Sequence, residues 1–166
     1  AINCQAAQEK LTALHPSADV TFFCGDLMQQ SEARRLAEEI HKALDQTGGA
    51  LHALINNAGC VRSWYMTTGE GLEQQFALNH LSGFLLTHEL LPNLIKGGGR
   101  ILYTSSGSHK MTRMNWQDLM FQKRYRPLYA YKQSKLCNML TAFALNDRFS
   151  NSGIRTSNKP LSWVLV

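Results

Sequence analysis

Short apolar segments alternate with longer amphipathic segments along this chain. The apolar runs at 20–24, 51–55 and 100–104 are too short for typical helices and are rich in residues that favour strands. Between them, segments 33–44 and 70–92 carry apolar residues at steps of three and four, which predicts helices. Parallel strands need a crossover connection, which is usually a helix. The alternation therefore predicts an α/β fold built on a parallel sheet.

Two further helices are predicted near the ends of the chain. Apolar residues recur at helical spacing over about 4–14, ahead of Pro16, and again over about 128–149. Gly48-Gly49 is expected to end the helix before it, because glycine adopts positive φ at helix ends. The helix over 4–14 is expected to end at His15-Pro16, because the residue before a proline avoids helical geometry. The stripe over 70–92 is expected to stop near Pro92.

Composition is that of one folded domain. The 166 residues are 44% apolar and 17% charged, with no repeat or linker, so we expect a single domain over 1–166. No apolar run is long enough to predict a membrane-spanning segment. The four cysteines are far apart and form no C-x-x-C pair, which favours neither a metal site nor a disulfide framework. Reduced thiols and a cytoplasmic location are expected.

Positive charge is concentrated in one segment. The chain has 17 Lys and Arg against 12 Asp and Glu, a formal net charge of +5, and His109–Arg126 carries much of this excess. Aromatic residues lie among the basic ones, which would suit nucleic acid. A nucleic-acid domain usually presents a charged stripe and a recognisable module, and neither is evident. We therefore expect a solvated loop that lines a substrate entrance, and no nucleic-acid partner.

An amide interrupts the apolar stripe of the segment 70–92. Asn79 stands where that stripe calls for an apolar side chain. A buried amide without partners costs about 1–3 kcal/mol, so Asn79 must bond to backbone, water or a reacting group. A structural and a functional asparagine are both consistent with the sequence.

Tyr131 and Lys135 are four residues apart on the last predicted helix, and therefore share one face. An ammonium one turn from a phenol favours the phenolate and makes it a better base near neutral pH. Thr104-Ser105-Ser106-Gly107 follows an apolar strand, at the edge where parallel α/β sheets bind ligands. A hydroxyl there can donate to a carbonyl oxygen as negative charge develops on it.

Four motifs together resemble the short-chain dehydrogenase/reductase family. They are Asn56-Asn57-Ala58-Gly59, Asn79 within Leu78–Leu81, Ser106 after a strand, and Tyr131-x-x-x-Lys135, in the family's order and at about its intervals. The run Tyr131–Asn138 is most similar to the retinol-dehydrogenase-like branch. The resemblance extends over about residues 1–158 and implies an oxidoreductase acting on a small carbonyl or alcohol substrate.

Catalytic roles follow from this resemblance. It implies that Tyr131 is the general acid/base while hydride moves to or from a nicotinamide, and that Lys135 lowers the pKa of Tyr131 and holds the nicotinamide ribose. Ser106 would polarise the substrate oxygen, although the register leaves Ser105 open as the alternative. Asn79 would hold a water that passes protons to solvent.

Cofactor contacts are implied in the same way. The resemblance places Asp26 at the adenine amino group with Leu27 beside it, and Asn56, Ala58 and Gly59 along the adenosine ribose. Tyr131 and Lys135 belong to the cofactor site as well as to the catalytic group. The residue that selects between NAD and NADP is not identifiable, so the cofactor is either of the two.

The sequence departs from the family at both ends. It lacks the Gly-rich turn that binds pyrophosphate. The family's Pro-Gly turn is also missing, because Pro160 comes one residue early and Leu161 stands where the glycine is expected. In the strand order 3-2-1-4-5-6, the two missing strands would lie between 20–24 and 51–55 and leave unpaired edges. A sixth strand begins at Gly153-Ile154. We expect a partial doubly wound Rossmann sheet that lacks its first two strands and the C-terminal substrate segment.

Two functions are compatible with this pattern. One is a hydride-transferring oxidoreductase in which Asn79, Ser106, Tyr131 and Lys135 act together. The other is a non-catalytic piece of the same fold that serves in binding or scaffolding, which the absent phosphate turn favours. The resemblance further implies homo-oligomers that pair through the helices bearing Asn79 and Tyr131.

Overall fold

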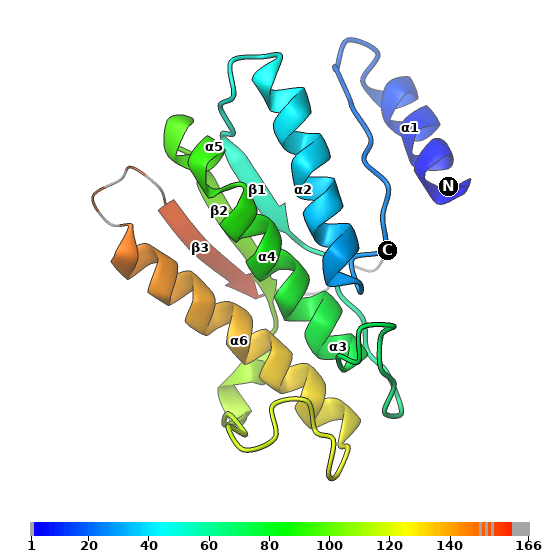
Figure 1. Cartoon of the computed structure of the whole chain (residues 1–166), viewed down its shortest axis with the longest axis vertical. Coiled ribbons are helices and arrows are strands. Elements are labelled where there is room, and N and C mark those ends of the chain that lie inside the picture. The colour runs from blue at the N-terminus through cyan, green and yellow to red at the C-terminus, as the bar shows by residue number, and fades with distance from the viewer. Residues whose placement is uncertain (1, 150, 152, 154, 161–166) are drawn as a thin grey trace.

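The computed structural model describes residues 2–149, 151, 153 and 155–160. Its sheet has three parallel strands in the order β1 (Ala53–Asn56), β2 (Arg100–Ser105) and β3 (Arg155–Pro160) (Figure 1). Asn56 of β1 lies opposite Tyr103 of β2, so the two strands end close together at their carboxyl edge. The parallel α/β prediction is confirmed, and the three strands lie in the order implied for the fourth, fifth and sixth strands of a Rossmann sheet.

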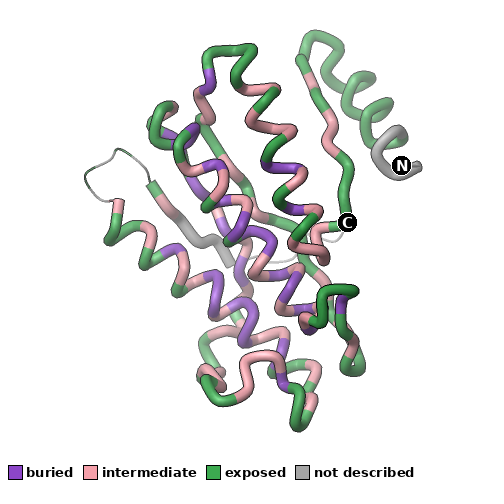
Figure 2. The backbone as a smooth tube through the Cα atoms, viewed as in Figure 1, coloured by how far each residue is buried: buried purple, intermediate pink, exposed green. Residues whose placement is uncertain are grey.

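Three long helical segments lie on one face of this sheet (Figure 1). They are α2 (Gln30–Asp45), the run α4 (Ser82–Glu89) with α5 (Leu91–Lys96), and α6 (Pro127–Arg148). Alternate β2 side chains, Ile101 and Tyr103, point to this face and are buried against Leu94 and Ala142. Figure 2 shows the buried residues gathered where α4, α6 and β2 meet. The core therefore holds together the elements that carry the candidate site residues.

Local sequence explains how α2 packs and where it ends. Ala33, Leu36 and Ala37 recur at helical spacing and are buried, so one stripe anchors the helix. Gly48 and Gly49 follow it with φ of 91° and 72°, values that L side chains rarely adopt. The N–H of Gly49 donates to the carbonyl of Leu44 at 2.7 Å, which closes the helix end. The predicted stop at Gly48-Gly49 is confirmed.

The prediction of a strand over 20–24 was wrong. In the structure this segment forms no strand and runs as an irregular, partly exposed chain beside α2 (Figure 1). An extended segment is stabilised as a strand only when its backbone N–H and C=O groups form hydrogen bonds with a neighbouring strand. Within the described residues β1 pairs with β2 alone, and Ile55 on β1 is 65% exposed, as expected for an unpaired edge.

The predicted helix over 70–92 forms in several pieces. A short α3 (Gln74–Phe76) leads into a π-helical turn, η1 (Ala77–Leu81), before α4. α4 ends at Glu89, close to the stop expected near Pro92. Pro92 itself lies in the first turn of α5, where a backbone N–H would have no partner within the helix. The break falls at Leu90, whose φ and ψ of −89° and 4° are not helical.

Three expected elements remain. α1 (Ile2–Leu14) and α6 confirm the predicted first and last helices, although Leu14 of the α1 stripe is 72% exposed. β3 confirms the expected strand near the C-terminal end. Gly153 lies in a turn before it with φ of 78°, and Ile154 lies outside the described residues. The basic segment after Ser106 is a loop that begins with a short 3-10 helix, η2 (Gly107–Met111).

Candidate functional site

The turn Asn56-Asn57-Ala58-Gly59 leaves the carboxyl end of β1 and is held on two sides. The amide Nδ2 of Asn56 donates to Thr87 Oγ1 on α4 at 3.1 Å. The hydroxyl of Thr104 at the end of β2 donates to Asn57 Oδ1 at 2.8 Å. These bonds fix the turn between the helix layer and the neighbouring strand.

Asn79 lies in η1 and is buried. Its Oδ1 accepts the backbone N–H of Cys60 at 2.7 Å, and its Nδ2 donates to the Cys60 carbonyl and to Ser134 Oγ, each at 3.0 Å. The carbonyl of Asn79 accepts from Nδ2 of Asn138 at 2.8 Å. Asn79 therefore joins the segment after the β1 turn to α6, and its amide is satisfied by protein groups.

Lys135 stands where these elements meet. Its ammonium donates to the carbonyl of Thr104 at 3.1 Å and lies 5.7 Å from the ring centroid of Tyr131. A Cβ placed on Gly59 would come within 3.3 Å of Lys135 Nζ and 3.2 Å of Asn79 Oδ1. Only 4% of Lys135 is exposed, and burial lowers its pKa. The β1 turn, the end of β2, η1 and α6 thus converge on one amine.

Burial of this amine predicts a pH-dependent stability. Because the pKa of Lys135 is below its ordinary 10.5 in the folded chain, the unfolded chain binds this proton more tightly, and the charged form costs stability. That cost begins to fall as pH rises through the folded-state pKa, and it is gone above the ordinary pKa of 10.5. Urea denaturation at about pH 7 and about pH 10 should therefore show Lys135→Met gaining less over wild type, or losing more, at the higher pH.

The matched control is Lys96→Met, because Lys96 is exposed on α5. Its difference from wild type in the free energy of unfolding should not change between the two pH values. Parallel profiles for Lys135→Met and Lys96→Met would contradict the assigned burial cost.

The two serines at the end of β2 have different surroundings. Ser105 is fully buried, and its hydroxyl donates to the carbonyl of Lys135 at 3.1 Å. Ser106 is half-buried at the start of η2, and its Oγ accepts from the N–H and hydroxyl of Ser108. Ser105 therefore anchors α6, while Ser106 has the hydroxyl that remains within reach of solvent.

Tyr131 is half-buried in the second turn of α6. Its carbonyl accepts from Ser134 Oγ at 2.7 Å, and its ring faces the Lys135 ammonium. Within the described residues its hydroxyl makes no hydrogen bond. The phenol is thus placed beside a cation, and none of the described residues occupies its donor or acceptor.

The residues expected at the adenosine end are only partly brought together. Leu27, Asn56 and Ala58 line one small cavity of about 90 Å³, together with Asn79. Asp26 is exposed, and its carboxylate accepts the backbone N–H of Met28 at 3.0 Å. Asp26 thus turns the chain ahead of α2 and does not line that cavity.

Three residues of this network were not predicted to act in it. Cys60 holds Asn79 through its backbone, and Ser134 and Asn138 are buried partners of Asn79 on α6. On α6, the sequence signal for Ser134 and Asn138 was their helical spacing. They stand three and seven residues after Tyr131, on the same helix face as Lys135. Nothing local identifies Cys60, because its contact spans 19 residues along the chain.

Two general features of the described part of the chain bear on the site. No group of three or more His, Cys, Asp or Glu side chains there could hold a metal ion. None of the helices in the described ranges combines the length and the apolar character needed to cross a bilayer.

Comparison with known proteins agrees with these motifs. The family model for short chain dehydrogenase matches residues 2–118. Human retinol dehydrogenase 11 is 40% identical over 122 residues, covering 73% of this chain and 36% of that protein. Mouse retinol dehydrogenase 12 is 41% identical over 105 residues, which cover 63% of this chain and 33% of the mouse protein. This chain thus spans about a third of the length of these curated relatives.

Solved structures share the fold. A crystal structure of an uncharacterized protein from Mycobacterium paratuberculosis superimposes with a TM-score of 0.75 at 32% identity, over 95% of this chain and 57% of that one. A metagenomic short-chain oxidoreductase in complex with NADP gives a TM-score of 0.71 at 20% identity, over 96% of this chain and 66% of the other. With the match over residues 2–118, these likenesses establish a partial Rossmann fold, and the chain belongs to the short-chain dehydrogenase family.

Proposed function

We propose that this chain carries the reaction centre of an NAD(P)-dependent oxidoreductase, which moves a hydride between a nicotinamide and a small carbonyl or alcohol substrate. The observation that carries this proposal is the position of the Lys135 ammonium, between the Tyr131 ring, the Thr104 carbonyl and Gly59. A buried amine beside a phenol with a free hydroxyl is suited to proton transfer. Membership of an oxidoreductase family supports the same chemistry.

The roles proposed for the side chains follow from their surroundings. In the reducing direction Tyr131 gives its proton to the substrate oxygen, and Ser106 donates a hydrogen bond to that oxygen as its charge develops. Lys135 stabilises the phenolate that remains on Tyr131. When bound, the nicotinamide cofactor supplies the hydride, whose electron pair goes to the carbonyl carbon. In the oxidising direction Tyr131 takes the proton from the alcohol.

The residues present fit such a cofactor near the β1 turn. Gly59 lies so close to Asn79 and Lys135 that any side chain there would press on the ammonium, so the turn presents only backbone beside Lys135. The cavity at Leu27, Asn56 and Ala58 supports a place for the adenosine part. For Asn79 we propose a bracing role with a relay water beyond it, since both of its amide atoms already bond to protein.

Gly59→Ala is expected to weaken binding of reduced nicotinamide dinucleotide by at least about tenfold, because the new methyl occupies the space next to Lys135. Nicotinamide fluorescence during a titration measures this binding. Gly107→Ala is the matched control, since a Cβ there meets nothing within 4 Å, and its Kd should equal that of wild type.

The same titration separates the two functions. A saturable signal with wild type supports the oxidoreductase. No saturation of wild type up to about 1 mM cofactor would reject it, and would favour the non-catalytic binding or scaffolding piece. Equal effects of Gly59→Ala and Gly107→Ala on the Kd would contradict the proposed cofactor position at the β1 turn.

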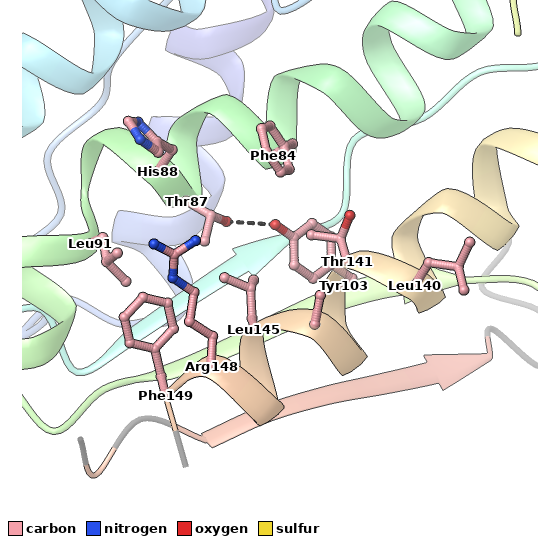
Figure 3. Close-up of a pocket in the computed structure, with 11 residues that line it drawn as sticks. Phe84, Thr87, His88, Leu91, Tyr103, Leu140, Thr141, Leu145, Arg148 and Phe149 are labelled. Carbon is pink, nitrogen blue, oxygen red and sulfur yellow. Dashed lines mark hydrogen bonds between the residues drawn. The ribbon is translucent and has the colours of Figure 1, made fainter. Parts of the chain in front are cut away.

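We also propose that α4 and α6 pair with the same helices of a second copy. A groove of about 450 Å³ runs between them, with Phe84, Leu91 and Leu145 among its apolar lining residues (Figure 3). Tyr103 closes its floor, where burial raises the pKa of its phenol to about 12 and its hydroxyl donates to Thr87 at 2.8 Å. Phe84 and Leu140 are about half exposed beside it, and an exposed apolar patch on two helices suits a two-fold interface.

Phe84→Glu is expected to convert a dimer to a monomer in sedimentation equilibrium, because it buries a charge in the proposed interface. Leu14→Glu, on the exposed part of α1, is the matched control and should leave the mass unchanged. A wild-type chain that sediments as a monomer at all concentrations would contradict this pairing.

A further inference from the structure

The loop between Ser106 and Tyr131 and the turn after it carry the chain's whole excess of positive charge. Residues 109–132 contain six Lys and Arg against Asp118 alone, which equals the formal net charge of +5. Asp118 is engaged locally, because its carboxylate accepts the N–H groups of Gln122 and Lys123. The six cations form no ion pair within the described residues: Lys110, Arg113, Lys123, Arg124, Arg126 and Lys132.

These cations line one continuous surface. Lys110 and Arg113 border an open depression of about 420 Å³ with Tyr129. A second depression, of about 330 Å³, is bordered by Lys123, Arg124 and Arg126. The two are joined where the guanidinium of Arg126 stacks on the Tyr129 ring at 3.9 Å. We call this region the basic surface.

Large apolar side chains project from the same segment. Met111 is 82% exposed, Trp116 71% and Leu128 56%. Single exposed apolar residues are ordinary, but several among unpaired cations mark an interaction surface. The segment with the highest positive charge therefore also exposes large apolar side chains to solvent.

The backbone of this loop is nevertheless held in place. Buried Gln133 on α6 accepts the N–H of Asn115 at 2.7 Å and donates to the carbonyl of Leu119 at 2.8 Å. Farther along, the hydroxyl of Tyr125 donates to the buried carboxylate of Glu73 at 2.9 Å. With both ends of the loop tied to the core, the exposed side chains are presented by an ordered scaffold.

We propose that the basic surface binds the surface of an anionic lipid bilayer. Cations near such a surface are attracted to its phosphate and carboxylate groups, and Trp and Tyr side chains favour the level of the headgroups. Met111 and Leu128 supply apolar contacts that a nucleic acid or a free phosphate could not use. This mode needs no membrane-spanning helix, and it is independent of the proposed oxidoreductase activity.

The test is co-sedimentation of the full chain with vesicles of phosphatidylcholine, alone or with about 30% phosphatidylserine. We expect binding to the anionic vesicles only, falling at least about tenfold between about 0.1 M and 0.5 M salt. The double variant Arg113→Glu, Lys123→Glu should lower vesicle affinity at least about tenfold, and Met111→Ser with Trp116→Ser should lower it at least about threefold.

Matched controls lie at the opposite end of the sheet (Figure 1). Lys42→Glu with Lys96→Glu reverses two exposed charges on α2 and α5, and Ile95→Ser removes an apolar side chain that is 44% exposed. Both should bind vesicles as wild type does, and circular dichroism should be the same for all variants.

Several outcomes would overturn the proposal. They are no binding to anionic vesicles, equal losses for the basic-surface and control variants, and binding that ignores Met111 and Trp116. Inorganic phosphate or polyuridylic acid that displaces the chain from vesicles at concentrations matched in charge to the lipid would also overturn it. That last result would assign the surface to free anions or to nucleic acid.

Discussion

Replacing Tyr131 with phenylalanine is expected to lower kcat by about 10²- to 10⁴-fold, because the ring is kept while the group that exchanges the proton is lost. The affinity for cofactor should remain within about twofold, since the phenyl ring still packs beside Lys135. Steady-state kinetics by nicotinamide absorbance, together with a cofactor titration, measures both quantities.

Tyr129→Phe is the matched control, because Tyr129 lies on the same helix two residues earlier and is 40% exposed. It should retain the wild-type kcat. If Tyr131→Phe keeps more than about a tenth of the rate, the general acid/base is another group, since removing such a group costs about 10²-fold or more.

Truncating Leu94 to alanine is expected to lower the free energy of unfolding by about 2–5 kcal/mol. Leu94 is fully buried on α5 against Ile101 and Tyr103, so the variant loses apolar contact and leaves a cavity under β2. Urea denaturation followed by circular dichroism measures the change.

Leu128→Ala is its control, since Leu128 is 56% exposed and should cost less than about 0.5 kcal/mol. Similar losses for the two leucines would mean that α5 is not packed in the core as described.

Sequence patterns predicted best the helices that are recognisable from the spacing of residues on one helix face. The stripe of α2 and the spacing of Tyr131 and Lys135 on α6 depend on helical periodicity, which is a local property of the backbone. The apolar run of β2 also correctly predicted a strand. This strand forms because both of its neighbouring strands are present in the sheet. The segment 20–24 is also apolar and rich in residues that favour strands, but it forms no strand, since strand formation needs a partner that composition does not reveal.

Within the site, sequence alone identified residue types and their order along the chain. It determined that an amine and a phenol share a helix face, that an amide stands in an apolar stripe, and that hydroxyls follow a strand. It could not tell which of Ser105 and Ser106 is buried, or say what satisfies Asn79. Those answers depend on contacts between segments distant in the chain: Ser105 with Lys135, and Asn79 with Cys60 and Ser134. Only packing of η1 and α6 at the carboxyl ends of β1 and β2 decided them, because burial and hydrogen-bond partners are properties of the assembled fold.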